Sequence, residues 1–142
     1  MARALGIDYG ERRVGLALSD PLGMIASPLP TLKRRKGKRA PVAPVARIVE
    51  ENEVTELVVG LPLGLDGEEN DWTREVRSFG DALAERTGLP VTYQDERMTS
   101  VRAERAVRSL GLSKKQREEK ERVDAAAAVL ILQAYLDTKQ SS

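Results

Sequence analysis

The sequence predicts an α/β fold built on a five-stranded mixed sheet, in which an antiparallel three-strand meander is extended by two parallel strands and flanked by helices. Two observations support this fold class. The first third of the chain contains three strand-like segments separated by turns, and the rest alternates helical apolar spacing with short apolar strands. A length of 142 residues fits one domain, which we expect over 1–138 with a short polar tail at 139–142.

The meander is predicted from alternating segments and turn residues. Strands are expected over 4–8 and 14–19, joined by a polar turn that contains Gly10. The turn Asp20-Pro21-Leu22-Gly23 then leads into a third strand over 24–32. Short turns between strands favour antiparallel pairing of neighbours.

The pattern then changes to α/β alternation. Apolar residues recur at helical spacing after Pro44, a residue tolerated in a first helical turn, and a short apolar strand is expected over 56–60. A loop rich in glycine and proline follows, and a helix over 68–86 is predicted from one apolar face made of Trp72, Val76, Phe79 and Leu83. Gly88 is expected to end this helix in the left-handed conformation.

The carboxyl-terminal third predicts one strand and two helices. The strand is expected over 91–94, and Thr99 or Ser100 can cap a helix that runs to about Leu110. Residues 123–136 are rich in alanine and apolar on nearly every side, which predicts a helix packed deep against the sheet.

Acidic residues stand where these apolar patterns end. If the first, fourth and fifth strands are parallel, their carboxyl ends share one edge of the sheet, where ligands bind in open α/β sheets. Asp8, the loop 60–67 and Glu96 all follow such strand ends. Asp124 joins them only if the amino end of its helix points to the same edge.

The composition limits the chemistry that this edge can perform. The chain has no histidine and no cysteine, which excludes imidazole acid–base catalysis, thiolate nucleophiles and zinc sites made of those residues. Carboxylates favour Mg²⁺ or Mn²⁺, and two such ions can promote displacement at phosphorus. We expect Asp8 to bridge two ions, with Glu96 and Asp124 each completing one shell. Alternatively, Asp8 starts a turn, Glu96 lies in a solvated loop and Asp124 favours a helix amino end.

Basic residues are clustered although the net charge is only +1. Six cations stand within 33–39 and are expected either to contact phosphates or to form a solvated loop. A second cluster precedes Asp124 but is diluted by glutamates, and the 61–67 loop could offer helix amides to a phosphate. The candidate nucleic-acid-binding residues are Lys33, Arg34, Arg35, Lys36, Lys38, Arg39, Leu61, Pro62, Gly64, Arg97, Lys120 and Arg122.

The sequence gives no sign of a membrane segment. No apolar run approaches the roughly 20 residues that span a bilayer, and residues 1–5 lack the apolar stretch of a secretory signal. We therefore expect a cytoplasmic protein without a membrane partner.

Four segments resemble, in order and spacing, those of the YqgF/RuvX family, described as pre-16S rRNA nucleases and as Holliday junction resolvases. They are Gly6-Ile7-Asp8-Tyr9-Gly10, Val58-Val59-Gly60-Leu61-Pro62-Leu63 with Asp66-Gly67, Asp95-Glu96-Arg97-Met98-Thr99 and Val123-Asp124-Ala125-Ala126-Ala127. The resemblance implies an RNase H-like fold and a metal-dependent nuclease that processes the 5′ end of precursor 16S rRNA. It also places Asp8, Glu96 and Asp124 in the acidic positions of the family. RuvC-type resolvases carry a fourth acid where this chain has Ala127, which disfavours junction resolution.

Other functions stay open at this point. A Holliday junction resolvase would act on structured DNA, and a non-catalytic assembly factor would bind rRNA or a pre-ribosomal particle through the basic cluster alone. The Gly-Ile-Asp-x-Gly segment also resembles a phosphate-binding loop of sugar kinases and actin-like ATPases, but 142 residues supply only about one of their two lobes. The sequence does not decide between monomer and homodimer.

Overall fold

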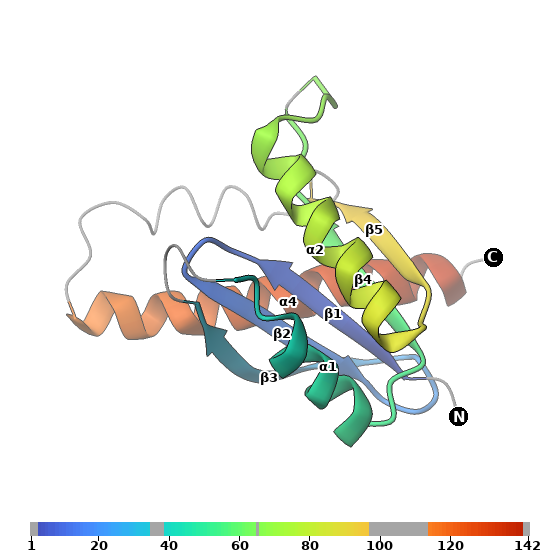
Figure 1. Ribbon diagram of the computed structural model, residues 1–142. Coiled ribbons are helices and arrows are strands. Elements are labelled where there is room, and N and C mark those ends of the chain that lie inside the picture. Colours follow the sequence, from blue (N-terminus) through green and yellow to red (C-terminus); the bar gives the residue numbers. More distant parts are fainter. Residues whose placement is uncertain (1–2, 35–38, 65, 97–113, 141–142) are drawn as a thin grey trace.

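The computed structural model describes residues 3–34, 39–64, 66–96 and 114–140, and for 114–124 it describes the backbone alone (Figure 1). Eight elements fall in these ranges: β1 (Ala4–Tyr9), β2 (Arg13–Ser19), β3 (Ala26–Lys33), α1 (Val42–Glu51), β4 (Glu56–Leu61), α2 (Asp71–Thr87), β5 (Val91–Asp95) and α4 (Lys114–Gln140). The predicted helix that begins at Thr99 or Ser100 lies outside the described residues.

The five strands form one mixed sheet in the order β3-β2-β1-β4-β5. β1 pairs antiparallel with β2, and β2 pairs antiparallel with β3. β4 is parallel to both β1 and β5. The predicted meander with two added parallel strands is therefore confirmed, and the carboxyl ends of β1, β4 and β5 share one edge, which we call the carboxyl edge.

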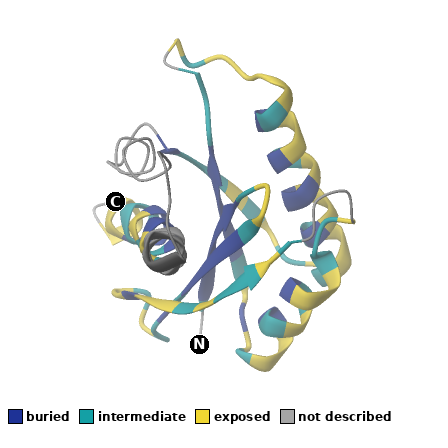
Figure 2. Cartoon of the chain, turned by 90° about the vertical axis from the view of Figure 1, so that its left-hand side faces the viewer, coloured by how far each residue is buried: buried dark blue, intermediate teal, exposed yellow. Residues whose placement is uncertain are grey.

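Helices cover both faces of the sheet. Figures 1 and 2 show α1 and α2 on one face and α4 on the other, with the most deeply buried residues between these layers. The α1/α2 face holds the larger apolar cluster, which includes Ile7, Val59 and Phe79. The α4 face holds a second cluster with smaller sheet residues, among them Ala4 and Ala17. The sheet residues alternate between these clusters, as period-2 strands require.

α4 lies very close to the sheet because the residues beneath it are small. A Cβ placed on Gly6 would come within 2.6 Å of Leu132 Cβ and 3.1 Å of the Ala128 carbonyl oxygen. Lys139, near the other end of α4, lies 3.2 Å from Glu56, the first residue of β4. The helix therefore runs antiparallel to β1 and β4, so its amino end points toward the carboxyl edge.

The long helix differs from the prediction in two respects. It begins at Lys114, nine residues before the predicted start at 123, and it continues through Gln140. It is also not buried on every side, because Ala126 is exposed and Leu130 keeps 37% of its surface accessible. Only the side that bears Ala128, Leu132 and their neighbours packs on the sheet.

The start of α2 also differs from the prediction. The helix begins at Asp71 and not at 68, because the Asn70 side chain accepts a hydrogen bond from the Thr73 amide at 2.9 Å and forms a capping box. Its end is as predicted, since Gly88 adopts φ 73° in the left-handed region.

In the part of the chain that the structure describes, no helix combines the length and apolar character needed to cross a bilayer.

Candidate functional site

Asp8 is a buried acid near the carboxyl edge. It belongs to β1, the central strand, and only 3% of its surface is exposed. Its neighbours Ile7 and Tyr9 both belong to the cluster on the α1/α2 face. Because side chains alternate along a strand, Asp8 lies on the α4 face, the same face as Gly6.

Glu96 is the second buried acid, with 5% of its surface exposed. It follows β5 directly, and its Oε1 atom lies 3.0 Å from the point where a Cβ on Gly60 would stand. Ile131 of α4 flanks the same point, with its Cδ1 atom 2.5 Å away. Glu96 therefore also lies on the α4 face, above β4.

The strand register brings these acids to neighbouring positions. Ile7 of β1 pairs with Val59 of β4, so the next residues along the two parallel strands are Asp8 and Gly60. Neighbouring strands are separated by about 4.8 Å. Asp8 and the carboxylate of Glu96 above Gly60 thus share one side of the sheet at the carboxyl edge, where the sequence predicted that they would converge.

The third predicted acid, Asp124, belongs to α4. It lies one helical turn before Ala128, whose carbonyl is close to Gly6, and this direction along α4 leads toward the carboxyl edge. The backbone thus meets the condition set from sequence, that the amino end of this helix points to the edge that holds Asp8. The side chain of Asp124 lies outside the described part of the chain.

The donor atoms at this edge fit a hard divalent cation. Carboxylate oxygens are the ligands that Mg²⁺ and Mn²⁺ prefer, and buried acids on a central strand are held rigidly. Among the described side chains, no three His, Cys, Asp or Glu residues form a group that could hold a metal. These side chains include Asp8 and Glu96 but not the third predicted acid, Asp124, whose side chain lies outside the described part of the chain.

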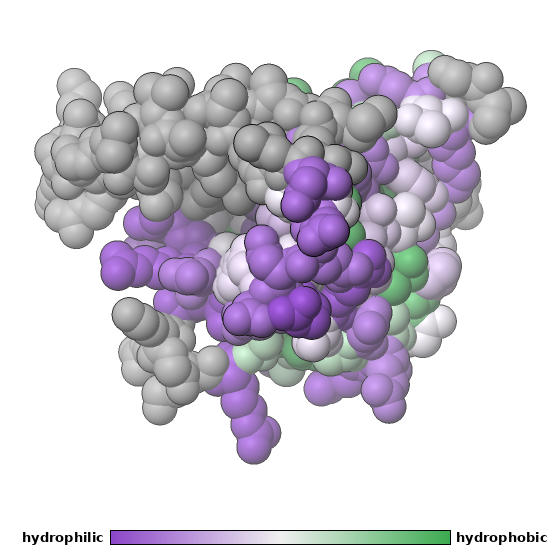
Figure 3. Space-filling model, turned by 90° about the horizontal axis from the view of Figure 1, so that it is seen from above, coloured by the Kyte–Doolittle hydropathy of each residue, from purple (hydrophilic) through white to green (hydrophobic). Residues whose placement is uncertain are grey.

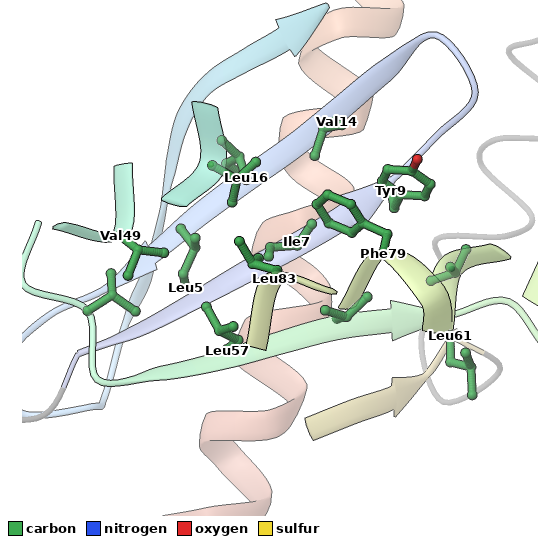
Figure 4. Close-up of a cluster of buried hydrophobic side chains, with 14 residues drawn as sticks. Leu5, Ile7, Tyr9, Val14, Leu16, Val49, Leu57, Leu61, Phe79 and Leu83 are labelled. Carbon is green, nitrogen blue, oxygen red and sulfur yellow. The ribbon is translucent and has the colours of Figure 1, made fainter. Parts of the chain in front are cut away.

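The opposite side of β1 carries an aromatic stack that sequence reasoning missed. The Tyr9 ring lies 4.2 Å from that of Phe79, centroid to centroid (Figure 4). The centroid of the Trp72 ring lies 5.7 Å from that of Tyr9. Trp72 is therefore part of the core packing, as its spacing predicted. Burial raises the pKa of the Tyr9 hydroxyl, and the nearby Arg34 cation opposes this shift.

The basic cluster begins at the carboxyl edge. β3 runs in the same direction as β1, since both are antiparallel to β2. Lys33 and Arg39 are exposed, whereas Arg34 is half-buried and donates a hydrogen bond of 2.9 Å to the Gly10 carbonyl. Arg35, Lys36 and Lys38 lie outside the described residues, and the predicted phosphate contacts of this cluster remain predictions.

The loop after β4 has fewer groups available to bind a phosphate than the sequence predicted. Leu61 is buried with 4% exposure, so its side chain belongs to the core. The Pro62 carbonyl accepts a hydrogen bond from the Thr73 hydroxyl at 2.8 Å, and the Gly64 amide donates to the backbone carbonyl of Glu68 at 2.9 Å. Because Asn70 occupies the Thr73 amide, that amide of α2 is not available to an anion.

For the three remaining candidate residues, Arg97, Lys120 and Arg122, the structure describes no side chain. Arg97 lies outside the described residues. Lys120 and Arg122 belong to the amino-terminal part of α4, where the structure gives the backbone alone. Viewed from above, the described surface is mainly hydrophilic, with a smaller apolar area (Figure 3).

Comparisons with known proteins show the family to which the chain belongs. The family model "RuvX: Holliday junction resolvase" matches residues 2–138. A protein of Koribacter versatilis (strain Ellin345) named "Putative pre-16S rRNA nuclease" is 47% identical over 137 residues, covering 96% of this chain and 88% of that protein. A protein of the same name from Chloroflexus aggregans (strain MD-66 / DSM 9485) is 45% identical over 137 residues, covering 96% and 94%.

Solved structures show the same fold at low sequence identity. The Thermus thermophilus RuvC in complex with a Holliday junction substrate superposes with a TM-score of 0.56 at 15% identity, covering 99% of this chain and 96% of that one. The Fowlpox virus resolvase bound to Holliday junction DNA gives 0.56 at 10% identity, covering 96% and 97%. The expected RNase H-like architecture is thereby confirmed, and the chain belongs to the RuvX family.

Proposed function

We propose that this protein is a divalent-metal-dependent nuclease that hydrolyses phosphodiester bonds during 5′-end processing of precursor 16S rRNA. The observation that carries the proposal is the placement of two buried carboxylates, Asp8 and Glu96, on one side of the sheet at its carboxyl edge. The names of relatives more than 40% identical support both the reaction type and the RNA substrate.

The chain would contribute rigid hard-oxygen ligands. Asp8 on the central strand is our candidate to bridge two cations, and Glu96 and Asp124 would each complete one shell. The chemistry that two bound Mg²⁺ or Mn²⁺ ions supply is activation of a water and stabilisation of the leaving oxygen at phosphorus. Burial of Asp8 and Glu96 limits their motion, so little reorganisation is needed when ligands arrive.

The basic cluster would hold the nucleic acid beside these acids. Lys33 is the last residue of β3 and Arg34 follows it, at the same edge as Asp8, and Arg34 contacts the β1–β2 turn directly. Cations at this place can neutralise backbone phosphates without reading base sequence. We expect the protein to act in the cytoplasm.

A second candidate function is resolution of Holliday junctions. The description of the matching family favours it. It would use the same carboxylates on a branched DNA substrate. Ala127, which stands where RuvC-type resolvases have a fourth acid, is buried with 2% exposure and offers no ligand, which makes junction resolution the weaker of the two proposals.

The decisive experiment compares wild type with Asp8→Asn on three substrates. A precursor 16S rRNA 5′ fragment, an unstructured single-stranded RNA and a four-way DNA junction are each incubated with Mn²⁺, with Mg²⁺ or with a chelator. Glu85→Gln, which removes an exposed carboxylate from α2, is the matched control. We expect metal-dependent cleavage of the precursor by wild type and by Glu85→Gln, and its loss in Asp8→Asn.

The other outcomes either indicate another function or refute the site. Preferred cleavage of the junction would favour the resolvase. Tight RNA binding without cleavage at any metal concentration would indicate a non-catalytic assembly factor. Undiminished cleavage by a well-purified Asp8→Asn protein would refute the site.

A further inference from the structure

Gly60 has no side chain at the point where β4, α4 and Glu96 meet. A Cβ at this position would stand 2.5 Å from Ile131 Cδ1, 3.2 Å from Ile131 Cγ1 and 3.0 Å from Glu96 Oε1. Ile131 is fully buried, and Glu96 is 5% exposed. The missing methyl group therefore leaves a recess between strand and helix, and the Glu96 carboxylate fills part of it.

The need for glycine here is steric and not conformational. The glycines with positive φ among the described residues are Gly23, Gly67 and Gly88. The Gly60 backbone thus has φ/ψ values that alanine can adopt. The Cβ of an alanine would clash with Ile131, because real Cβ atoms almost never approach other heavy atoms to 2.5 Å.

We propose that Gly60 is a positioning residue, whose recess fixes the Glu96 carboxylate above β4 beside Asp8. The expected effect on catalysis rests on the proposed function. The expected effect on the position of Glu96 does not. Ile131 forms the α4 side of the recess, so the helix and the strand together determine where the carboxylate lies.

The test must separate the position of Glu96 from simple packing. Gly60→Ala alone collides with both Ile131 and Glu96. The double variant Gly60→Ala/Ile131→Val removes the Cδ1 atom and hence the worst collision with α4, but keeps the methyl group 3.0 Å from Glu96 Oε1. Gly6→Ala is the matched control, because the three atoms nearest to its Cβ would all belong to Ala128 and Leu132 of α4.

Two readouts and a folding control are needed. The first is the carboxyl ¹³C chemical shift of Glu96 in the metal-free protein, assigned with Glu96→Gln. The second is the rate of Mn²⁺-dependent cleavage, measured as kcat and KM separately. Thermal unfolding reports which variants are folded.

We expect the double variant to unfold near the temperature of Ile131→Val alone, yet to show a shifted Glu96 resonance and a kcat lowered by about tenfold with KM little changed, because small misplacements of a reacting group are costly. Gly6→Ala should lower the unfolding temperature and leave the Glu96 resonance in place. A double variant with the wild-type resonance and the wild-type kcat would overturn the proposal. If wild type cleaves nothing, the proposed function fails, and the Glu96 resonance still decides whether Gly60 positions that carboxylate.

Discussion

The guanidinium carbon of Arg34 lies 4.5 Å from the centroid of the Tyr9 ring. The same side chain donates to the Gly10 carbonyl, and the Arg34 amide donates to the Arg12 carbonyl at 2.7 Å. Arg34 therefore attaches the start of the basic cluster to the turn that follows Asp8. Since Tyr9 is the residue after Asp8 on the central strand, the candidate nucleic-acid-binding segment and the candidate catalytic acid are mechanically connected.

Arg34→Ala should destabilise the fold by about 1–2 kcal/mol, because it removes a cation–π contact and a hydrogen bond to a partly buried carbonyl. Arg39→Ala removes the same kind of side chain from an exposed position and should change the free energy of unfolding by less than about 0.5 kcal/mol. Urea unfolding of the two variants measures the difference. Equal stability of both variants would show that Arg34 is an ordinary surface cation.

Replacing Lys33, Arg35, Lys36, Lys38 and Arg39 by glutamine, with Arg34 retained as the anchor, should reduce the salt dependence of RNA binding. For a single strand, each lost phosphate contact lowers the slope of log K against log salt by roughly 0.7. The control is Arg47→Gln/Arg86→Gln, which neutralises exposed cations on α1 and α2. Binding titrations at several salt concentrations give the slopes, and a slope that the five substitutions leave unchanged would mean that the cluster is only solvated.

The sheet could be predicted because its signals are local. Turn residues such as Gly10 and the Asp20–Gly23 turn separate alternating strands, and the structure reproduces all five strands to within about two residues. The predicted start of α2, at 68, was wrong, although Asn70 and Thr73 have the residue types and spacing of a capping box. The early start of α4 could not be found by apolar periodicity, because its first turns consist of Lys, Arg, Glu and Gln, whose helix propensity is high but which form no apolar face.

Only part of the candidate site could be predicted, because some of its features depend on topology and others on contacts between distant elements. Strand ends in a parallel sheet share an edge whatever the side chains are, so the convergence of Asp8 and Glu96 followed from topology. The recess at Gly60 and the contact of Arg34 with Tyr9 depend on distances between elements far apart in sequence. Sequence patterns specify which face a residue occupies, but not how closely a helix approaches it.

Tyr93 should make stability depend on pH in the alkaline range. Burial, followed by the hydrogen bond to Asp81, raises the pKa of Tyr93 above its ordinary value of 10.0. Below pH 10 the phenol is protonated in both folded and unfolded protein, and its contribution is complete. Above pH 10 the unfolded chain loses this proton first, so the folded protein is destabilised as pH rises.

We therefore expect the free energy of unfolding to fall more between pH 9 and about pH 11 in wild type than in Tyr93→Phe. Tyr135→Phe, which removes a phenol from α4, is the control for general alkaline effects. Denaturant unfolding at each pH provides the data. If wild type and Tyr93→Phe lose stability in parallel, then the phenol of Tyr93 is not held against Asp81 in solution.

Two aspartates of α4 provide a test of the third acid. Asp124 lies toward the carboxyl edge, and Asp137 is between three and four turns further along the helix, where its carboxylate accepts a hydrogen bond from Gln133 at 2.9 Å. If Asp124 is a metal ligand, Asp124→Asn should lower Mn²⁺-dependent cleavage by about a hundredfold and weaken Mn²⁺ binding, because a neutral amide replaces a charged oxygen ligand. Asp137→Asn should leave both unchanged. Isothermal titration with Mn²⁺ and cleavage assays at saturating metal check this, and equal activity of the two variants would remove Asp124 from the site while leaving Asp8 and Glu96 in it.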